Sequence, residues 1–219
     1  MVTKKSRILI LMMILISSVI FYSCSSSSSI IGSWKKPAYS GKKFNKVIVL
    51  AVGKNIVIRS TMEKEIVSRL KEIKVTAAAG SDIITQEMIE FDKDNKVTEK
   101  TKTMVLEKIK ENYFDGALII ALKDIKESEH YVPGTVYRPY PGYGTFYNFY
   151  YASYGAAYSP GYIEKTTEIF LVSNFYDITT EELLWSAQSE TYNPSSLKDL
   201  VASYSTVVVN EMAKEGVLK

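Results

Sequence analysis

The chain has 219 residues, of which 46% are hydrophobic and 23% are charged, a composition typical of one globular domain with extensions. The net charge is +3, but the first 23 residues contain three basic and no acidic residues. The remainder is therefore close to neutral, which offers no support for the basic surface typical of nucleic-acid binding, and we predict no nucleic-acid partner. One cysteine and one histidine exclude an intrachain disulfide and any metal site with two thiolates.

The amino terminus has the layout of a secretory signal. Lys4, Lys5 and Arg7 precede a dense apolar run over residues 8–16, and a weaker apolar stretch continues to Tyr22. A run of about 15 residues spans roughly 22 Å as a helix, which is short for the roughly 30 Å of bilayer hydrocarbon. An uncleaved anchor, or an ordinary signal followed by a chance cysteine, remains the alternative.

The signal ends in Phe21-Tyr22-Ser23-Cys24. This stretch resembles the lipobox of bacterial lipoproteins, with Phe21 in place of the usual Leu and Tyr22 in place of a small residue. The resemblance implies that residues 1–23 are removed and that Cys24 carries covalent lipid, with no other cofactor. Several acyl chains give stable membrane anchoring. Because no aspartate follows Cys24, the resemblance also implies the outer membrane, facing the periplasm.

The residues after Cys24 predict a tether. Residues 25–29 are five consecutive serines, which cannot bury enough apolar surface to become ordered. We therefore predict a lipidated, Ser-rich tether over residues 24–43 and a single folded domain over 44–219. Fully stretched, such a tether reaches roughly 60 Å.

The first half of the domain predicts alternating strands and helices. Continuous apolar runs at 47–52 and 117–122 indicate strands buried on both faces. Ser60 and Glu63 have the spacing of a capping box, ahead of apolar residues at helical spacing. A further strand is predicted over 74–79 and a helix over 98–112. This β-α-β-α-β order implies parallel pairing with right-handed crossovers.

The second half predicts an antiparallel hairpin and a helix. Residues 167–176 alternate as a strand does, and 183–187 follow a short polar turn. Asn193-Pro194 is predicted to open a final helix, which Gly216 ends. The β-branched run at 206–209 leaves a strand as the alternative there. The fold class is α/β (α+β), a single mixed sheet with helices packed on it.

A loop rich in tyrosine, glycine and proline spans residues 131–162. Tyrosine gives a large amphipathic contact area at low entropy cost, so the loop predicts a surface for a protein partner, a glycan, peptidoglycan or lipid headgroups. A loop that packs on its own domain, or has no fixed structure, is the alternative. The candidate partner-binding residues are Tyr137, Tyr140, Tyr143, Tyr147, Tyr150, Tyr151, Tyr154 and Tyr158.

No set of residues predicts a catalytic or metal site. Arg59 follows the first strand, where α/β folds place ligands, and is a weak candidate for anion contact. A salt bridge or solvent exposure of Arg59 is the favoured alternative. Arg59, Asp115 and His130 are the groups that an enzyme acting on envelope polymers would use, a minor hypothesis. We predict that the protein is not an enzyme.

Several short motifs of the mature chain carry a family resemblance. They are Gly32-Ser33-Trp34 with Pro37, Phe44 to Val49, Arg59 with Glu63, Tyr131-Val132-Pro133-Gly134, Tyr176-Asp177 before Leu184-Trp185-Ser186, and Gly216-Val217-Leu218. Together they resemble a family of uncharacterised bacterial envelope lipoproteins, with Thr180-Glu181 in place of the expected Thr-Gly turn. The resemblance implies an architecture and a membrane address, but no catalytic residues. The order of elements is distantly similar to the amino-terminal domain of TolB and the periplasmic domain of curli-secretion lipoproteins, a likeness of fold alone.

The leading functional hypothesis is a non-catalytic binding or assembly module, held on the membrane by lipid, that contacts an envelope protein or glycan. Self-association into a secretion or adhesion assembly through the Tyr-rich segment is a further alternative. The sequence does not identify the partner or the oligomeric state.

Overall fold

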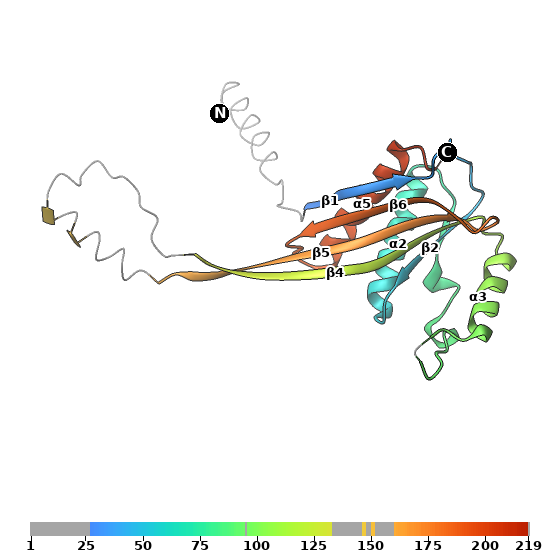
Figure 1. Cartoon of the computed structure of the whole chain (residues 1–219), viewed down its shortest axis with the longest axis horizontal. Helices are drawn as coiled ribbons and strands as arrows, with labels where there is room; N and C mark the ends of the chain where they lie inside the picture. Colours follow the sequence, from blue (N-terminus) through green and yellow to red (C-terminus); the bar gives the residue numbers. More distant parts are fainter. Residues whose placement is uncertain (1–26, 95, 133–145, 148–149, 152–159, 219) are drawn as a thin grey trace, which may run out of the picture.

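The computed structural model describes residues 27–94, 96–132, 146–147, 150–151 and 160–218. These residues form one six-stranded mixed sheet in the order β1-β6-β5-β4-β2-β3, with helices packed on it (Figure 1). The predicted fold class is confirmed. The signal segment and Cys24 lie outside the described residues.

The parallel half of the sheet follows the predicted order. Strand β2 (Val47–Val52) pairs in parallel with β3 (Ala77–Ala79) and with β4 (Gly116–Val132). Helix α2 (Ile56–Glu72) and helix α3 (Glu99–Glu111) make the two crossovers. Short 3₁₀ turns η1 (Gly80–Asp82) and η2 (Gln86–Met88) follow β3.

Strand β3 begins later than predicted because residues 73–76 reverse the chain after α2. Lys74 adopts a left-handed conformation with φ 64°. The Val75 N–H donates to the Leu70 carbonyl at 2.9 Å and the Lys74 N–H donates to the Lys71 carbonyl at 2.9 Å. These two bonds form a Schellman motif, which ends the helix before the strand can start.

The predicted capping box of Ser60 and Glu63 is wrong. Helix α2 is capped by Asn55, whose side chain accepts hydrogen bonds from the N–H groups of Val57 and Ile58 at 2.9 and 3.2 Å. Ser60 therefore lies inside the helix, and Glu63 is free to bind elsewhere. Asparagine is as good an N-cap as serine, and it precedes the first helical turn here.

The antiparallel half contains the predicted hairpin and final helix. Strands β5 (Tyr162–Asp177) and β6 (Glu182–Tyr192) pair with each other, and β5 also pairs with β4. Helix α5 (Leu197–Lys214) includes the β-branched run, so the strand alternative there is wrong. The Ser196 side chain caps it, so Pro194 precedes the helix instead of occupying its first position. Gly216, with φ 65°, ends it as predicted.

The structure corrects the predicted tether at residues 27–35. These residues form edge strand β1 (Ser27–Lys35), which pairs antiparallel with β6. The Ser28 hydroxyl lies 2.7 Å from the hydroxyls of both Thr191 on β6 and Ser203 on α5. Serine side chains bury little apolar area, but backbone pairing and hydroxyl contacts hold this part of the edge.

Helices cover both faces of the sheet centre. The main core cluster joins α2 and α5 to one face, while a second cluster joins α3 to the other. Val47, Ile48 and Val49 on β2 are consequently fully buried, although neighbouring side chains point to opposite faces. The largest fully buried side chains of the main cluster are Trp185, Tyr204, Phe175, Ile66, Leu70, Leu118 and Met212.

We expect Tyr204→Phe to lower the free energy of unfolding by about 1–3 kcal/mol, because it leaves a buried hydroxyl unpaired. Tyr204 is fully buried, its oxygen lies 2.6 Å from the Ser173 hydroxyl, and burial raises the pKa of Tyr204, so the phenol stays neutral. Urea unfolding measures the change. The double variant Tyr204→Phe/Ser173→Ala removes both partners and should cost less than the sum of the single variants; strict additivity would contradict the assignment.

Candidate functional site

A two-stranded arm projects from one end of the sheet. Strand β6 ends at Tyr192, opposite Glu168 of β5, while β4 and β5 continue to the pair Val132 and Tyr162. Residues 127–132 and 162–167, here called the hairpin arm, therefore pair only with each other among the described strands (Figure 1). A register shift between Leu122 and Asp124 precedes the arm.

Asn193 fixes the base of the hairpin arm. Its N–H donates to the Thr167 carbonyl at 2.8 Å, and its side-chain oxygen accepts from the Thr167 N–H at 2.7 Å. Asn193 adopts a left-handed conformation with φ 43°, which asparagine tolerates better than most residues. Asn193 therefore ends the pairing of β6 with β5 and marks where the arm becomes independent.

The hairpin arm changes in character along its length. Midway along the arm, Lys165 and Glu129 form an ion pair at 2.6 Å. At the outer end, residues 131–132 and 162–163, the large side chains of Tyr131, Tyr162 and Ile163 are 68%, 60% and 59% exposed. A two-stranded ribbon in water is marginally stable by itself. The outer end thus presents aromatic and aliphatic side chains that are not buried in any core within the arm.

Gly161 lets the Tyr131 ring lie against the backbone at the outer end. A Cβ atom at Gly161 would come within 2.3 Å of the Tyr131 hydroxyl oxygen and 2.4 Å of its Cζ. Only glycine permits this approach without a shift. The glycine therefore positions a ring that remains largely exposed on its other side.

Three of the predicted partner-binding tyrosines, Tyr147, Tyr150 and Tyr151, are described. The Phe146 ring stacks on Tyr150 at 5.8 Å between centroids and meets Tyr147 edge-on at 5.5 Å. Tyr150 and Tyr151 meet edge-on at 5.6 Å. All three tyrosines are exposed. The others lie outside the described residues and stay predictions: Tyr137, Tyr140, Tyr143, Tyr154 and Tyr158.

Arg59 is buried, which corrects its assignment as a candidate anion contact. Its Nε donates to the Ala51 carbonyl at 3.0 Å, and Nη1 lies 3.5 Å from the Gln86 side-chain oxygen. Arg59 is 6% exposed and has no ion pair within 4.0 Å among the described residues. The two alternatives, a salt bridge and solvent exposure, are therefore also wrong. Because α2 starts at Ile56, Arg59 lies in the first turns, and helical side chains lean back toward the N-terminus, here onto β2.

Glu63 works with Arg59 as a structural clamp. Its carboxylate is fully buried and accepts hydrogen bonds from the Ala51 N–H at 2.8 Å and the Ser81 N–H at 2.6 Å. Arg59 and Glu63 therefore bind the C=O and N–H of one residue at the end of β2, and Glu63 also holds the chain after β3. The four-residue spacing, with Glu63 in line with buried Ile66 and Leu70, is the sequence signal that could have revealed this role.

We expect Glu63→Gln to lower the free energy of unfolding by about 1–3 kcal/mol. The amide has one acceptor oxygen, so the N–H of Ala51 or Ser81 loses its buried acceptor. Glu65→Gln on the same helix is the matched control, since Glu65 only pairs with partly exposed Arg69 and should cost below about 0.5 kcal/mol. Urea unfolding compares the two; equal losses would contradict a clamp at Glu63.

Arg59, Asp115 and His130 do not converge. Asp115 accepts hydrogen bonds from the N–H groups of Asn45 and Lys46 at 2.9 and 3.0 Å, which places it where β2 and β4 begin. Arg59 binds the opposite end of β2, and His130 lies on the hairpin arm. Within the described part of the chain, no group of three His, Cys, Asp or Glu residues is arranged to hold a metal ion.

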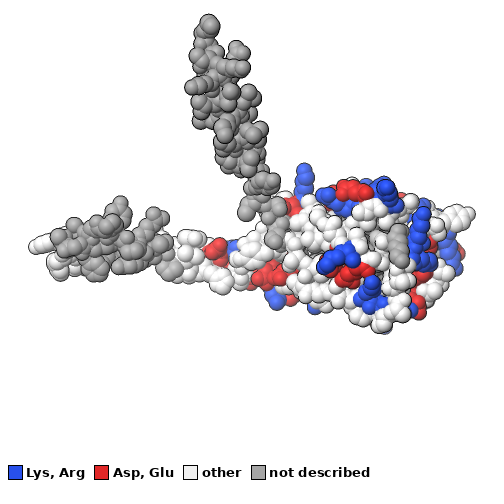
Figure 2. Space-filling view, turned by 90° about the horizontal axis from the view of Figure 1, so that it is seen from above, with Lys and Arg blue, Asp and Glu red and all other residues white. Residues whose placement is uncertain are grey.

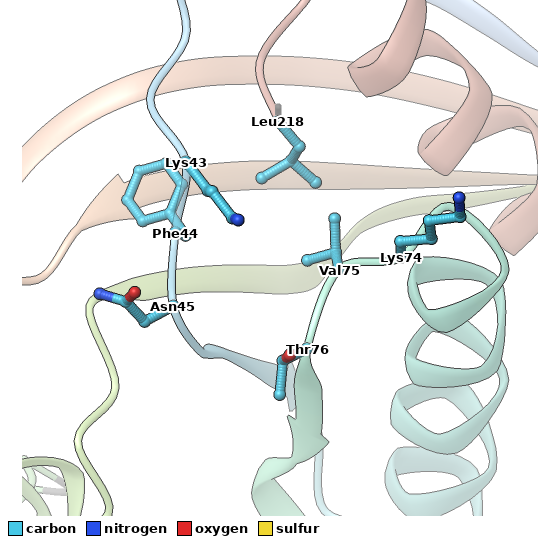
Figure 3. Close-up of a pocket in the computed structure, with 7 residues that line it drawn as sticks. All are labelled: Lys43, Phe44, Asn45, Lys74, Val75, Thr76 and Leu218. Carbon is cyan, nitrogen blue, oxygen red and sulfur yellow. The ribbon is translucent and has the colours of Figure 1, made fainter.

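A hollow of about 210 Å³ lies where the chain enters β2 and β3, beside Leu218 near the carboxyl terminus of the chain (Figure 3). Lys43 and Lys74 lie on its rim and both are exposed. No charged side chain that lines the hollow is buried, so it lacks the desolvated partner that a specific anion site uses. The lining residues are Lys43, Phe44, Asn45, Lys74, Val75, Thr76 and Leu218.

No described helix is long and apolar enough to cross a bilayer.

Comparisons with known proteins show only distant likenesses. No family model and no curated protein matches the chain. The PelC dodecamer from Paraburkholderia phytofirmans aligns at 11% identity over 83% of this chain and 95% of that one, with a TM-score of 0.42. The lipoprotein GNA1162 from Neisseria meningitidis aligns at 15% identity over 77% and 98%, with a TM-score of 0.40. Likeness at this level supports no inference about activity or partners, and the family resemblance stays a prediction.

Proposed function

We propose that this chain is a lipid-anchored protein of the cell envelope, a non-catalytic binding module that holds an envelope partner through the hairpin arm. The observation that carries the proposal is the arm itself, a ribbon that leaves the sheet and exposes Tyr131, Tyr162 and Ile163 at its outer end. Exposed aromatic surface of this kind marks interaction sites more often than inert surface.

The proposed anchor is supported by the position of Cys24. The only cysteine of the chain directly follows a basic segment and an apolar run, in the order of a lipoprotein signal. Lipid on this residue would bring the domain to a membrane surface. We propose the outer membrane, facing the periplasm, because serine and not aspartate follows Cys24.

The proposed absence of catalysis is supported by how the described polar groups are used. Arg59 and Glu63 are bound to the ends of β2 and β3, and Asp115 binds backbone N–H groups at the start of β2. Catalytic groups instead meet at one place where a reacting atom can sit. The best-placed candidates from the sequence are thus occupied in holding the sheet together.

We expect Cys24→Ala to move the protein out of the membrane fraction, because the thiol that carries the lipid is gone. Fractionation of cells that express either form measures the shift, and mass spectrometry of the purified wild type should show an acylated amino-terminal cysteine. Ser23→Ala, which keeps a small residue before the cysteine, is the control and should stay with membranes. A wild-type chain with an unmodified thiol, or one that still begins with Met1, contradicts the anchor.

We expect Tyr131→Ser/Tyr162→Ser to abolish crosslinking of the protein to envelope components in intact cells. Both rings are exposed and the arm is paired through its backbone, so the domain should stay folded. Tyr113→Ser is the matched control, because Tyr113 is 85% exposed and follows α3, away from the arm. Equal crosslinking of the double variant and the wild type would argue against binding through the arm.

A further inference from the structure

We propose that the outer end of the hairpin arm is a second membrane contact, seated in the interfacial layer of the same bilayer that holds Cys24. The proposal rests on the proposed function, since it requires lipid on Cys24. It names the partner of the arm as a lipid surface, in place of a protein or a glycan.

The link between the anchor and the folded domain is short. Ser27 is the first residue of β1 and pairs with Tyr192 of β6, and Cys24 is only three residues earlier in the chain. Three residues span at most about 10 Å. A bilayer surface that holds the lipid of Cys24 therefore passes within about 10 Å of this end of β1.

The hairpin arm extends from the same end of the sheet. Ser27, Tyr192, Glu168 and Lys126 are successive register partners, so they form one row across β1, β6, β5 and β4. From Glu168 to Tyr162 the arm continues past this row for about 20 Å, at about 3.3 Å per residue. Figure 1 shows β4 and β5 running well beyond the start of β1.

The two lengths together favour contact between the arm and the bilayer. The arm lies about 10–15 Å to the side of β1, at about 4.8 Å per strand. It reaches past the row by roughly twice what the three-residue link can span. With the sheet end facing the membrane, the outer end of the arm enters the surface by about 10 Å, the depth of an interfacial contact.

The side chains at the outer end suit that depth. Tyrosine places an apolar ring and a polar hydroxyl at the boundary between headgroups and acyl chains. The four residues of the outer end, Tyr131, Val132, Tyr162 and Ile163, carry no charge. Charged residues begin directly behind the outer end with exposed Glu164, followed by the ion pair of Glu129 and Lys165, and Figure 2 shows charged side chains over the domain and along the arm.

Site-specific fluorescence on the lipidated protein, expressed from the complete gene and processed at Cys24, tests the proposal. Because the thiol of Cys24 carries lipid, a newly introduced cysteine is the only one that reacts with an environment-sensitive dye such as NBD. The dye is placed at Tyr162→Cys and Ile163→Cys, whose side chains point to opposite faces of the ribbon. Leu106→Cys on α3 is the control, since Leu106 is an exposed apolar residue and α3 lies at the opposite end from the arm (Figure 1).

The labelled proteins are reconstituted into vesicles of phosphatidylethanolamine and phosphatidylglycerol, with or without brominated acyl chains. We expect the dye at both 162 and 163 to shift its emission to the blue and to be quenched several-fold more by brominated lipid than the dye at 106. Equal, weak quenching at all three positions would overturn the proposal. A blue shift without bromine quenching would also overturn it, because the arm would then be covered by protein, as in a second copy of the chain.

Mass spectrometry of the same preparations separates the two levels of the argument. If Cys24 is lipidated but the dyes at 162 and 163 remain in water, the membrane contact is refuted and the proposed anchor stands. An unmodified Cys24 refutes the anchor, and this inference with it. Urea unfolding of each labelled variant, compared with the wild type, tests whether the domain is folded in each preparation.

Discussion

The antiparallel pairing of β1 with β6 is the constraint on which the rest of the molecule depends. It brings the chain into register from Ser27 onward, so that residues close to Cys24 belong to the sheet. The contact of the Ser28 hydroxyl with Thr191 and Ser203, and the hydrogen bond from Lys35 Nζ to the Glu215 carbonyl, tie the strand to both β6 and α5. An anchor on Cys24 would therefore restrict the orientation of the domain, as a long tether would not.

The sheet is held together by polar groups as well as by its apolar core. Arg59 and Glu63 bind the end of β2, Asp115 binds the entry to it, and Tyr204 meets Ser173 inside the main core cluster. Each of these groups is paired, which is what makes burial of polar atoms tolerable. The same pairing occupies the side chains that looked most like candidates for chemistry, and leaves the hairpin arm as the main unexplained surface.

Much of the architecture could be predicted from periodicity. The buried runs of β2 and β4, the helix predicted over 98–112 that is α3, and the hairpin of β5 with β6 follow from spacing alone. The predictions that were wrong concern residues whose type and spacing fit more than one structural role. Glu63 has the spacing of a capping partner but binds Ala51 and Ser81, and a serine run that looks like a linker also fits an edge strand held by backbone hydrogen bonds.

The sequence by itself determined the order of strands and helices from β2 to α5, the position of a lone cysteine after an apolar run, and the absence of acidic residues between Tyr131 and Ile163. These are properties of neighbours along the chain, which local periodicity and composition report directly. Only the tertiary structure decided that Arg59 is buried, that β1 forms one edge of the sheet, and that the arm leaves from the end of the sheet where β1 begins. Those facts depend on which distant segments share hydrogen bonds, and no pattern within one segment carries that information.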